Sequence, residues 1–311
     1  MTELSLSVDL YDITKKLIIK SGSTVDFKLV RHLLDHGSKL KKTLIPFGTT
    51  ELFKHFSNVF NEEKYFTIFT PYSLNEEIKE YARQTEITKE LYEELKFTRE
   101  FLPYTFRHVL LVTAMIIKLS IDLKDKGYKP EHAAIIGLVH DLGKTRISKQ
   151  ILGKDTPLTQ SEYETLKSHS LISYLLLCYY LGHESEGITS AVRDHHEKLD
   201  GSGYPRKSMH INKYARLIAP IDIFDALISE RPYRSSPFTL RQAMDHLVTE
   251  ANAGRIDRDI VFYLISYIRK EHPHPGELQP YSGPQNNLPA DNMWGKVIPD
   301  GEISRGTTRS L

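Results

Sequence analysis

The sequence predicts an all-α fold, in which a helical bundle follows a small N-terminal auxiliary domain and precedes an irregular C-terminal tail. Between residues 75 and 271, apolar residues recur with helical spacing in one segment after another. Runs with the alternation typical of strands are scarce in this region. From residue 272 the chain is rich in proline and glycine and has no period, which is typical of an irregular tail.

Residues 1–90 form the predicted auxiliary domain, for which the sequence suggests no specific function. The stretch DFKLVRHLLDHG predicts a helix that ends at Gly37, because glycine is a common helix C-cap. The stretch KYFTIFTPY predicts a weak strand that ends at Pro71. We expect this domain to have a packing or regulatory role.

The bundle domain covers residues 91–271, and the tail covers residues 272–311, with Trp294 as a candidate anchor. A charged amphipathic helix from Glu76 to Arg99 is expected to lead into the bundle. The further predicted helices are 106–123, which is strongly apolar and central, 131–140, a helix opened by the capping box Thr159–Glu162, then 188–197, 213–229, 240–253 and 259–270.

Composition narrows the class of protein. The 311 residues are 40% hydrophobic and 26% charged, which fits a soluble globular chain with a sizeable core. A net charge of +1 provides no general attraction to nucleic acid or to an anionic membrane, so neither is an expected partner. Cys178 is the single cysteine, which precludes an intramolecular disulfide. Without a signal-peptide pattern at the N-terminus, we expect a cytoplasmic protein.

Titratable side chains interrupt several of the apolar helices. An unpaired imidazole or carboxylate costs roughly several kcal/mol to bury, so these groups are expected to meet one another or a common partner. A pair of metal ions would accept such a set of nitrogen and oxygen ligands. The set comprises His108, His140, Asp141, His169, His195, His196, Asp222 and Asp225.

A lone histidine on an apolar helix is more often a hydrogen-bonded core residue than a ligand. That interpretation is kept for His132, His183, His210 and His246. The same interpretation is harder to apply to the other five histidines, one of which is followed directly by an aspartate, because several independent coincidences would be required.

Three motifs resemble those of the HD-GYP branch of the HD metal-dependent phosphohydrolases. They are HDLGK at 140–144, HHEKLDGSGYP at 195–205 and DIFDALISERPYR at 222–234, and their order and intervals match over about 100–270. The resemblance implies an HD-type helical bundle. It also implies a metal-dependent phosphodiesterase that binds cyclic di-GMP and hydrolyses it to linear pGpG or to GMP.

The resemblance further implies two metal ions, since Tyr104 stands where members with a third ion have a glutamate. Nitrogen and oxygen ligands together favour iron, with manganese as an alternative and zinc or nickel less favoured. The implied ligands are Asp141 as the bridge, His108, His140 and Asp222 at one ion, and His169, His195 and His196 at the other.

Substrate contacts are implied for Lys144, Gly203, Tyr204, Arg231 and Arg234. Guanidinium groups suit phosphate because they donate in a planar fork, and the two glycines of DGSGYP permit a tight turn. Without the resemblance, Lys144 reads as a surface lysine, Tyr204 as part of a helix-ending turn and the arginines as an exposed loop pair.

The carboxylates next to these motifs are expected to brace the ligands rather than to bind metal. They are Asp225, one helical turn after Asp222, together with Glu197 and Asp200.

Two other functions remain open from the sequence. A cyclic di-GMP receptor with low turnover is favoured by Pro220, which removes a backbone donor from the helix that carries Asp222. An HD hydrolase of another cyclic dinucleotide is the second. The intact ligand set counts against the receptor, and the DGSGYP and RPYR segments count against the other hydrolase.

Overall fold

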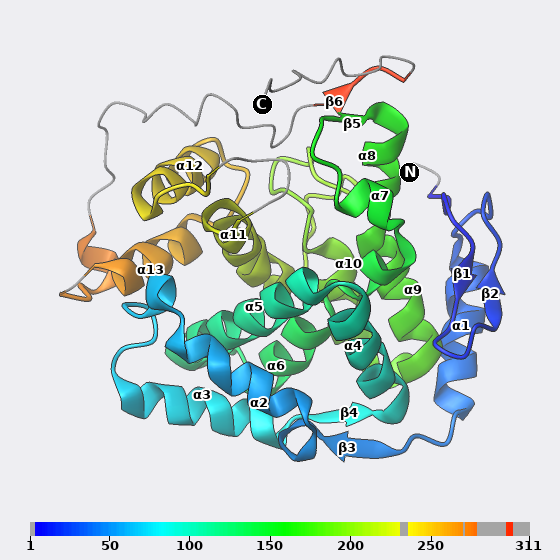
Figure 1. Cartoon of the computed structure of the whole chain (residues 1–311), viewed down its shortest axis with the longest axis horizontal. Coiled ribbons are helices and arrows are strands. Elements are labelled where there is room, and N and C mark those ends of the chain that lie inside the picture. The colour runs from blue at the N-terminus through cyan, green and yellow to red at the C-terminus, as the bar shows by residue number, and fades with distance from the viewer. Residues whose placement is uncertain (1–3, 231–235, 270, 279–296, 301–311) are drawn as a thin grey trace, which may run out of the picture.

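Helix α5 (Pro103–Asp122) runs through the middle of the fold, and every residue from His108 to Ser120 is buried (Figure 1). It packs against α6 (Pro130–Val139) and α11 (Lys213–Ile228). By length and hydropathy α5 would suffice to cross a membrane, but most of it is buried inside the protein. The burial reflects its sequence, in which apolar residues occur on all sides of the helix.

The computed structural model describes residues 4–230, 236–269, 271–278 and 297–300, and within these it confirms the predicted all-α fold. The other helices are α1 (Phe27–Lys39), α2 (Leu52–Asn58), α3 (Tyr72–Gln84), α4 (Lys89–Phe101), α7 (Lys149–Leu152), α8 (Gln160–Lys167), α9 (His169–Leu181), α10 (Glu186–Asp194), α12 (Leu240–Asn252) and α13 (Arg258–Ile268).

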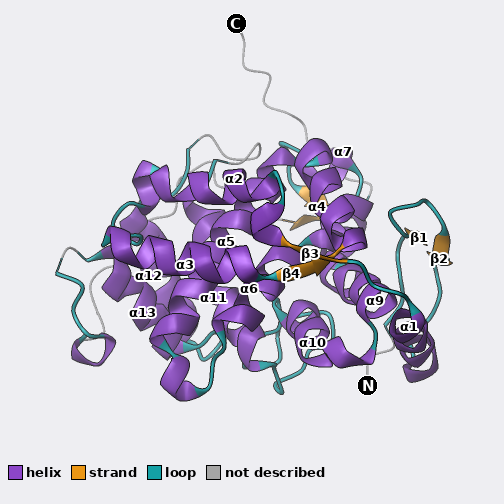
Figure 2. Ribbon diagram, turned by 90° about the horizontal axis from the view of Figure 1, so that it is seen from below, coloured by secondary structure: helices purple, strands orange, loops and turns teal. Residues whose placement is uncertain are grey.

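The strands are short and lie in pairs, with β1 and β2 at one side of the helical body and β3 and β4 across the face seen in Figure 2. Their bounds are β1 (Leu10–Tyr11), β2 (Leu17–Ile19), β3 (Leu44–Pro46), β4 (Glu86–Thr88), β5 (Leu158–Thr159) and β6 (Val297–Ile298). The first two pairs, β1 with β2 and β3 with β4, are antiparallel, whereas β5 and β6 are parallel. The β3–β4 pair joins two segments of the N-terminal region about forty residues apart.

Helices α6, α8 and α10–α13 confirm the predicted ranges to within a few residues, and Thr159 and Glu162 form the predicted capping box of α8. The single helix expected from Glu76 to Arg99 is wrong. The structure has α3 and α4 there, separated by β4. Thr88 is extended, and its hydroxyl accepts a hydrogen bond from Leu91 N at 3.3 Å, so it caps a new helix.

Two predictions in the N-terminal region are also wrong. Helix α1 continues past Gly37 to Lys39. The expected strand in KYFTIFTPY is a 3₁₀ turn, Glu63–Tyr65, followed by further turns. Its buried residues Tyr65, Ile68 and Phe69 follow the three-to-four spacing of a helix rather than the alternation of a strand.

The N-terminal region packs on the bundle. Helices α2 and α3 lie against α5, and α1 lies against α9 (Figure 1). Buried residues from both sides of residue 90 belong to one apolar core. The boundary at residue 90 stays a prediction, and the proposed anchor Trp294 lies outside the described residues.

Candidate metal centre

The seven predicted metal ligands converge from five helices. His108 lies on α5, His140 and Asp141 follow α6, and His169 is the first residue of α9. The adjacent pair His195 and His196 follows α10, and Asp222 lies on α11. Six of them form two groups, in each of which the candidate ligand atoms lie within 4.8 Å of one another: His108, His140 and Asp222 in one, and His169, His195 and His196 in the other.

Asp141, the seventh, lies between the two groups. Its Oδ2 is 3.6 Å from His108 Nε2 and 3.5 Å from His140 Nε2. Its Oδ1 is 3.4 Å from His169 Nε2 and 4.0 Å from His195 Nε2. One oxygen therefore faces each group, which is the arrangement that a bridging carboxylate needs.

A backbone carbonyl at the end of a helix fixes the orientation of each of three histidines: α6 for His140, α8 for His169 and α10 for His195. In each case Nδ1 meets the backbone carbonyl three residues earlier. A carbonyl only accepts hydrogen bonds, so Nδ1 must carry the proton and Nε2 keeps its lone pair. The pairs are His140 with Gly137 O at 2.7 Å, His169 with Leu166 O at 2.7 Å, and His195 with Val192 O at 2.5 Å.

Several buried ligand atoms have no hydrogen-bond partner. They are Nε2 of His140 and His195, Oδ1 of Asp141, and Nε2 of His108, which lacks an aligned hydrogen bond although Asp222 Oδ1 lies 3.0 Å away. A buried polar atom left unsatisfied costs about 1–3 kcal/mol, so four in one place need a common partner. The lone pairs of these atoms point into the space between Asp141 and the two groups of ligands, and divalent metal ions accept such nitrogen and oxygen donors.

Burial and charge put the other ligands, though not His108, in the ionisation state that metal binding requires. Burial lowers the pKa of His140 to about 4 and that of His169 to about 3, so both are neutral at pH 7. Although burial opposes it, the Lys144 ammonium keeps the pKa of Asp141 well below its usual value. Lys144 Nζ lies 2.5 Å from Asp141 Oδ2.

Asp225 braces His108, because its Oδ2 lies 2.5 Å from His108 Nδ1. Burial disfavours the charged imidazole, but the carboxylates of Asp222 and Asp225 outweigh it and raise the pKa of His108 to about 9. The other oxygen of Asp225 accepts hydrogen bonds from Tyr65 Oη and from Ser229 Oγ, the latter at 3.0 Å. No sequence pattern points to Tyr65, because its contact with Asp225 spans 160 residues.

The DGSGYP turn folds back on the second group of ligands. Tyr204 stacks on His196, with ring centroids 4.7 Å apart, and Tyr204 N donates to His196 O at 3.1 Å. A Cβ on Gly203 would lie 2.5 Å from His196 O and 2.3 Å from Lys198 N, so only glycine fits without displacement. The turn therefore holds a tyrosine over the metal centre.

The two remaining carboxylates of this motif lie differently. Glu197 is buried and accepts from Arg206 N at 2.6 Å and Ser208 N at 3.0 Å, which secures the chain after the turn. Asp200 is exposed and accepts from Ser202 N at 2.9 Å, so it stabilises the turn rather than a ligand histidine.

Arg231 and Arg234, the predicted phosphate contacts, lie outside the described residues. The substrate roles of these arginines, and of Lys144, Gly203 and Tyr204, stay predictions.

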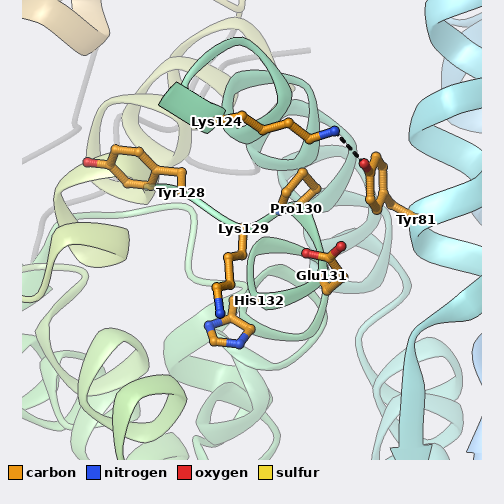
Figure 3. A pocket seen from close by; sticks show the side chains of 7 residues that line it. All are labelled: Tyr81, Lys124, Tyr128, Lys129, Pro130, Glu131 and His132. Carbon is orange, nitrogen blue, oxygen red and sulfur yellow. Dashed lines mark hydrogen bonds between the residues drawn. The ribbon is translucent and has the colours of Figure 1, made fainter. Parts of the chain in front are cut away.

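A surface pocket of about 550 Å³ lies at the start of α6, whereas His140 follows the other end of that helix (Figure 3). Its lining includes Tyr81, Lys124 and Lys129, and Lys124 Nζ donates to Tyr81 Oη at 2.6 Å. None of the seven ligand residues lines it. The pocket is therefore separate from the candidate metal ligands.

Comparison with known proteins agrees with the geometry. The model of the HD domain family matches residues 98–260, so the chain belongs to that family. Its DGSGYP turn and its relatives place it in the HD-GYP branch.

The chain resembles several bacterial phosphodiesterases. It is 35% identical over 159 residues to the 3'3'-cGAMP-specific phosphodiesterase 1 of Vibrio cholerae, covering 50% of this chain and 36% of the relative. It is 33% identical over 135 residues to a cyclic di-GMP phosphodiesterase of Pseudomonas aeruginosa, covering 42% and 32%. It is 37% identical over 139 residues to the cyclic di-GMP phosphodiesterase response regulator RpfG of Xanthomonas campestris, covering 42% and 35%. The chain spans about a third of the length of these relatives.

Proposed function

We propose that this protein is a dinuclear-metal phosphodiesterase that hydrolyses cyclic di-GMP to linear pGpG, to GMP or to both. The observation that carries the proposal is the pair of three-ligand groups with one oxygen of Asp141 facing each. The relatives support the substrate class, because their names describe phosphodiesterases of cyclic dinucleotides.

The proposed ions are iron, with manganese as the alternative, held by the seven residues described above. When bound, such ions lower the pKa of water and neutralise charge on phosphoryl oxygens. The protein contributes neutral imidazoles in a fixed tautomer and a carboxylate that is ionised at neutral pH. Lys144 places a positive charge beside Asp141, where an anionic phosphodiester would meet it.

Tyr204 stacks on His196 and so covers one face of this ligand. We assign it, with Gly203 and the arginines at 231 and 234, to binding of the dinucleotide. A cytoplasmic location is part of the proposal, since cyclic di-GMP is an intracellular messenger in the family that the motifs resemble.

A second candidate substrate is 3'3'-cGAMP. One observation favours it: the Vibrio cholerae relative that is 35% identical is named for that dinucleotide. A low-turnover receptor for cyclic di-GMP is the remaining alternative, in which the same residues bind the ligand.

The test is metal content followed by turnover on the same sample. Protein loaded with Fe²⁺ or Mn²⁺ under reducing conditions should retain two equivalents of metal and convert cyclic di-GMP to pGpG or GMP. If the protein cleaves 3'3'-cGAMP faster than cyclic di-GMP, 3'3'-cGAMP is the substrate instead. Binding of cyclic di-GMP without product would favour the receptor, and failure to retain metal would refute the metal centre.

A further inference from the structure

A hydrogen-bond chain connects the N-terminal region to the metal centre. Tyr65 lies on the 3₁₀ turn Glu63–Tyr65, before the HD family match begins at residue 98. Its side chain is fully buried, and its hydroxyl donates to Asp225 Oδ1. The other oxygen of Asp225 meets His108 Nδ1 at 2.5 Å, and His108 Nε2 faces the metal centre.

The same turn makes a second connection one residue away from the ligand. Arg107 precedes His108 on α5, and its guanidinium forms a two-point ion pair with Glu62. Arg107 Nη1 also lies 3.7 Å from Asp225 Oδ1 and donates to Ser229 Oγ at 3.3 Å. Residues 62–65 therefore contact Asp225 both directly and through Arg107.

We propose that Tyr65 is a positioning residue for the metal site formed by His108, His140 and Asp222, acting through Asp225. Asp225 has two oxygens, and each has a fixed partner: one orients the His108 imidazole, and the other is held by Tyr65 and Ser229. Hydrogen bonds that orient a ligand typically change metal affinity by about 10–100-fold when they are removed. The inference rests on the proposed function, since it requires metal at this site.

The position of Tyr65 also suggests how the N-terminal region could regulate the His108 site. Its turn lies outside the matched HD region, so a conformational change in residues 59–69 would alter the His108 site without altering a ligand. Within the described residues, the hydrogen bonds and ring contacts of Tyr65 do not reach the opposite group, His169, His195 and His196, which should therefore be insensitive to it.

The test is Mn²⁺ binding to metal-free full-length protein, with free Mn²⁺ followed by electron paramagnetic resonance. In Tyr65→Phe, one of two Mn²⁺ equivalents should bind about tenfold more weakly or worse, and the other as in wild type. The matched control is Tyr180→Phe. Tyr180 is also a buried tyrosine whose hydroxyl donates to a carboxylate, that of Glu94 at 2.8 Å. The control should bind both equivalents as wild type does.

Each outcome decides a different point. If Tyr65→Phe binds both Mn²⁺ equivalents with wild-type affinity, the inference is overturned and the metal centre stands. The inference is also overturned if Tyr180→Phe loses as much Mn²⁺ affinity as Tyr65→Phe. Wild-type protein that binds no Mn²⁺ would overturn the proposed function as well. If Tyr65→Phe does not fold, Ser229→Ala removes the other hydroxyl donor to the same oxygen. It must then show the same selective loss, and unchanged binding would overturn the inference.

Discussion

At the scale of single residues, the sequence predicted the ligands because each is a polar group within or next to a largely apolar helix. His108 is the clearest case, since buried apolar residues surround it in the chain. Tyr65 could not be found in this way. A tyrosine in an apolar segment is chemically unremarkable, and its value here depends on a partner 160 residues away. Local pattern therefore predicts the ligands and misses the residues that orient them.

The bridging position of Asp141 gives the first prediction. Asp141→Ala removes the one carboxylate that faces both groups, so both metal equivalents should be lost. The helical content should persist, because the helices pack through their apolar faces. Metal analysis and far-ultraviolet circular dichroism check this, and retention of both equivalents would contradict the assignment.

A second prediction concerns pH and the metal-free protein. Burial lowers the pKa of four ligand histidines, so the unfolded chain takes up their protons first as pH falls below about 6.5. Their contribution to the free energy of unfolding is present above that pH and is lost as the pH falls from about 6.5 toward the lower pKa values of the folded state. His108 has the opposite sign, and its contribution is lost only as pH rises toward about 9. The four are His140, His169, His195 and His196.

The measurement is urea unfolding of chelator-treated protein at pH 5 and pH 7. We expect a lower midpoint at pH 5, with a difference of about 1.4 kcal/mol for each pKa unit that is expressed. A higher midpoint at pH 5 would contradict the burial of these imidazoles in neutral form.

At the scale of elements, capping residues predicted where helices begin better than periodicity predicted where they end. Thr159 and Glu162 located the start of α8 correctly. The charged pattern from Glu76 to Arg99 concealed a break, because amphipathic spacing continues on both sides of β4. The extended residues 85–88, of which Thr88 pairs with Leu44, separate the two helices.

The DGSGYP turn gives a prediction at this scale. Gly203→Ala places a Cβ against the backbone of His196 and Lys198, so the turn must move and Tyr204 must leave the His196 ring. We expect a loss of stability of about 1–3 kcal/mol and a larger loss of phosphodiesterase activity. Gly187→Ala is the control, because Gly187 lies on α10 and a Cβ there meets nothing within 4 Å. Equal activity in the two variants would contradict this account of the turn.

At the scale of the whole molecule, the N-terminal region and the bundle share one core. Tyr65, Phe56 and Ile78 are fully buried in the same cluster as the apolar residues of α5. The sequence suggested a separate auxiliary domain because composition changes near residue 90. Sequence pattern could not show that this region covers the helix that carries His108, since packing between distant segments leaves no local period.

This packing predicts the behaviour of a fragment that contains residues 91–311. Removing residues 1–90 uncovers α5 and α9 and removes the Tyr65 contact. We expect the fragment to lose cooperative thermal unfolding and to bind a hydrophobic dye, unlike the full chain. A cooperative transition at the temperature of the full chain would establish instead that the two regions fold independently.

Three of the ligand histidines are each held by the carbonyl three residues earlier in the chain. Their positions therefore report on the packing of the helices. Each imidazole is held by the end of a helix, α6 for His140, α8 for His169 and α10 for His195, so the separation of the two ligand groups depends on how these helices are placed against one another. Magnetic coupling between two bound ions depends steeply on their spacing. Two ions bound at these groups would therefore report a shift of one helix along another as a change in that coupling.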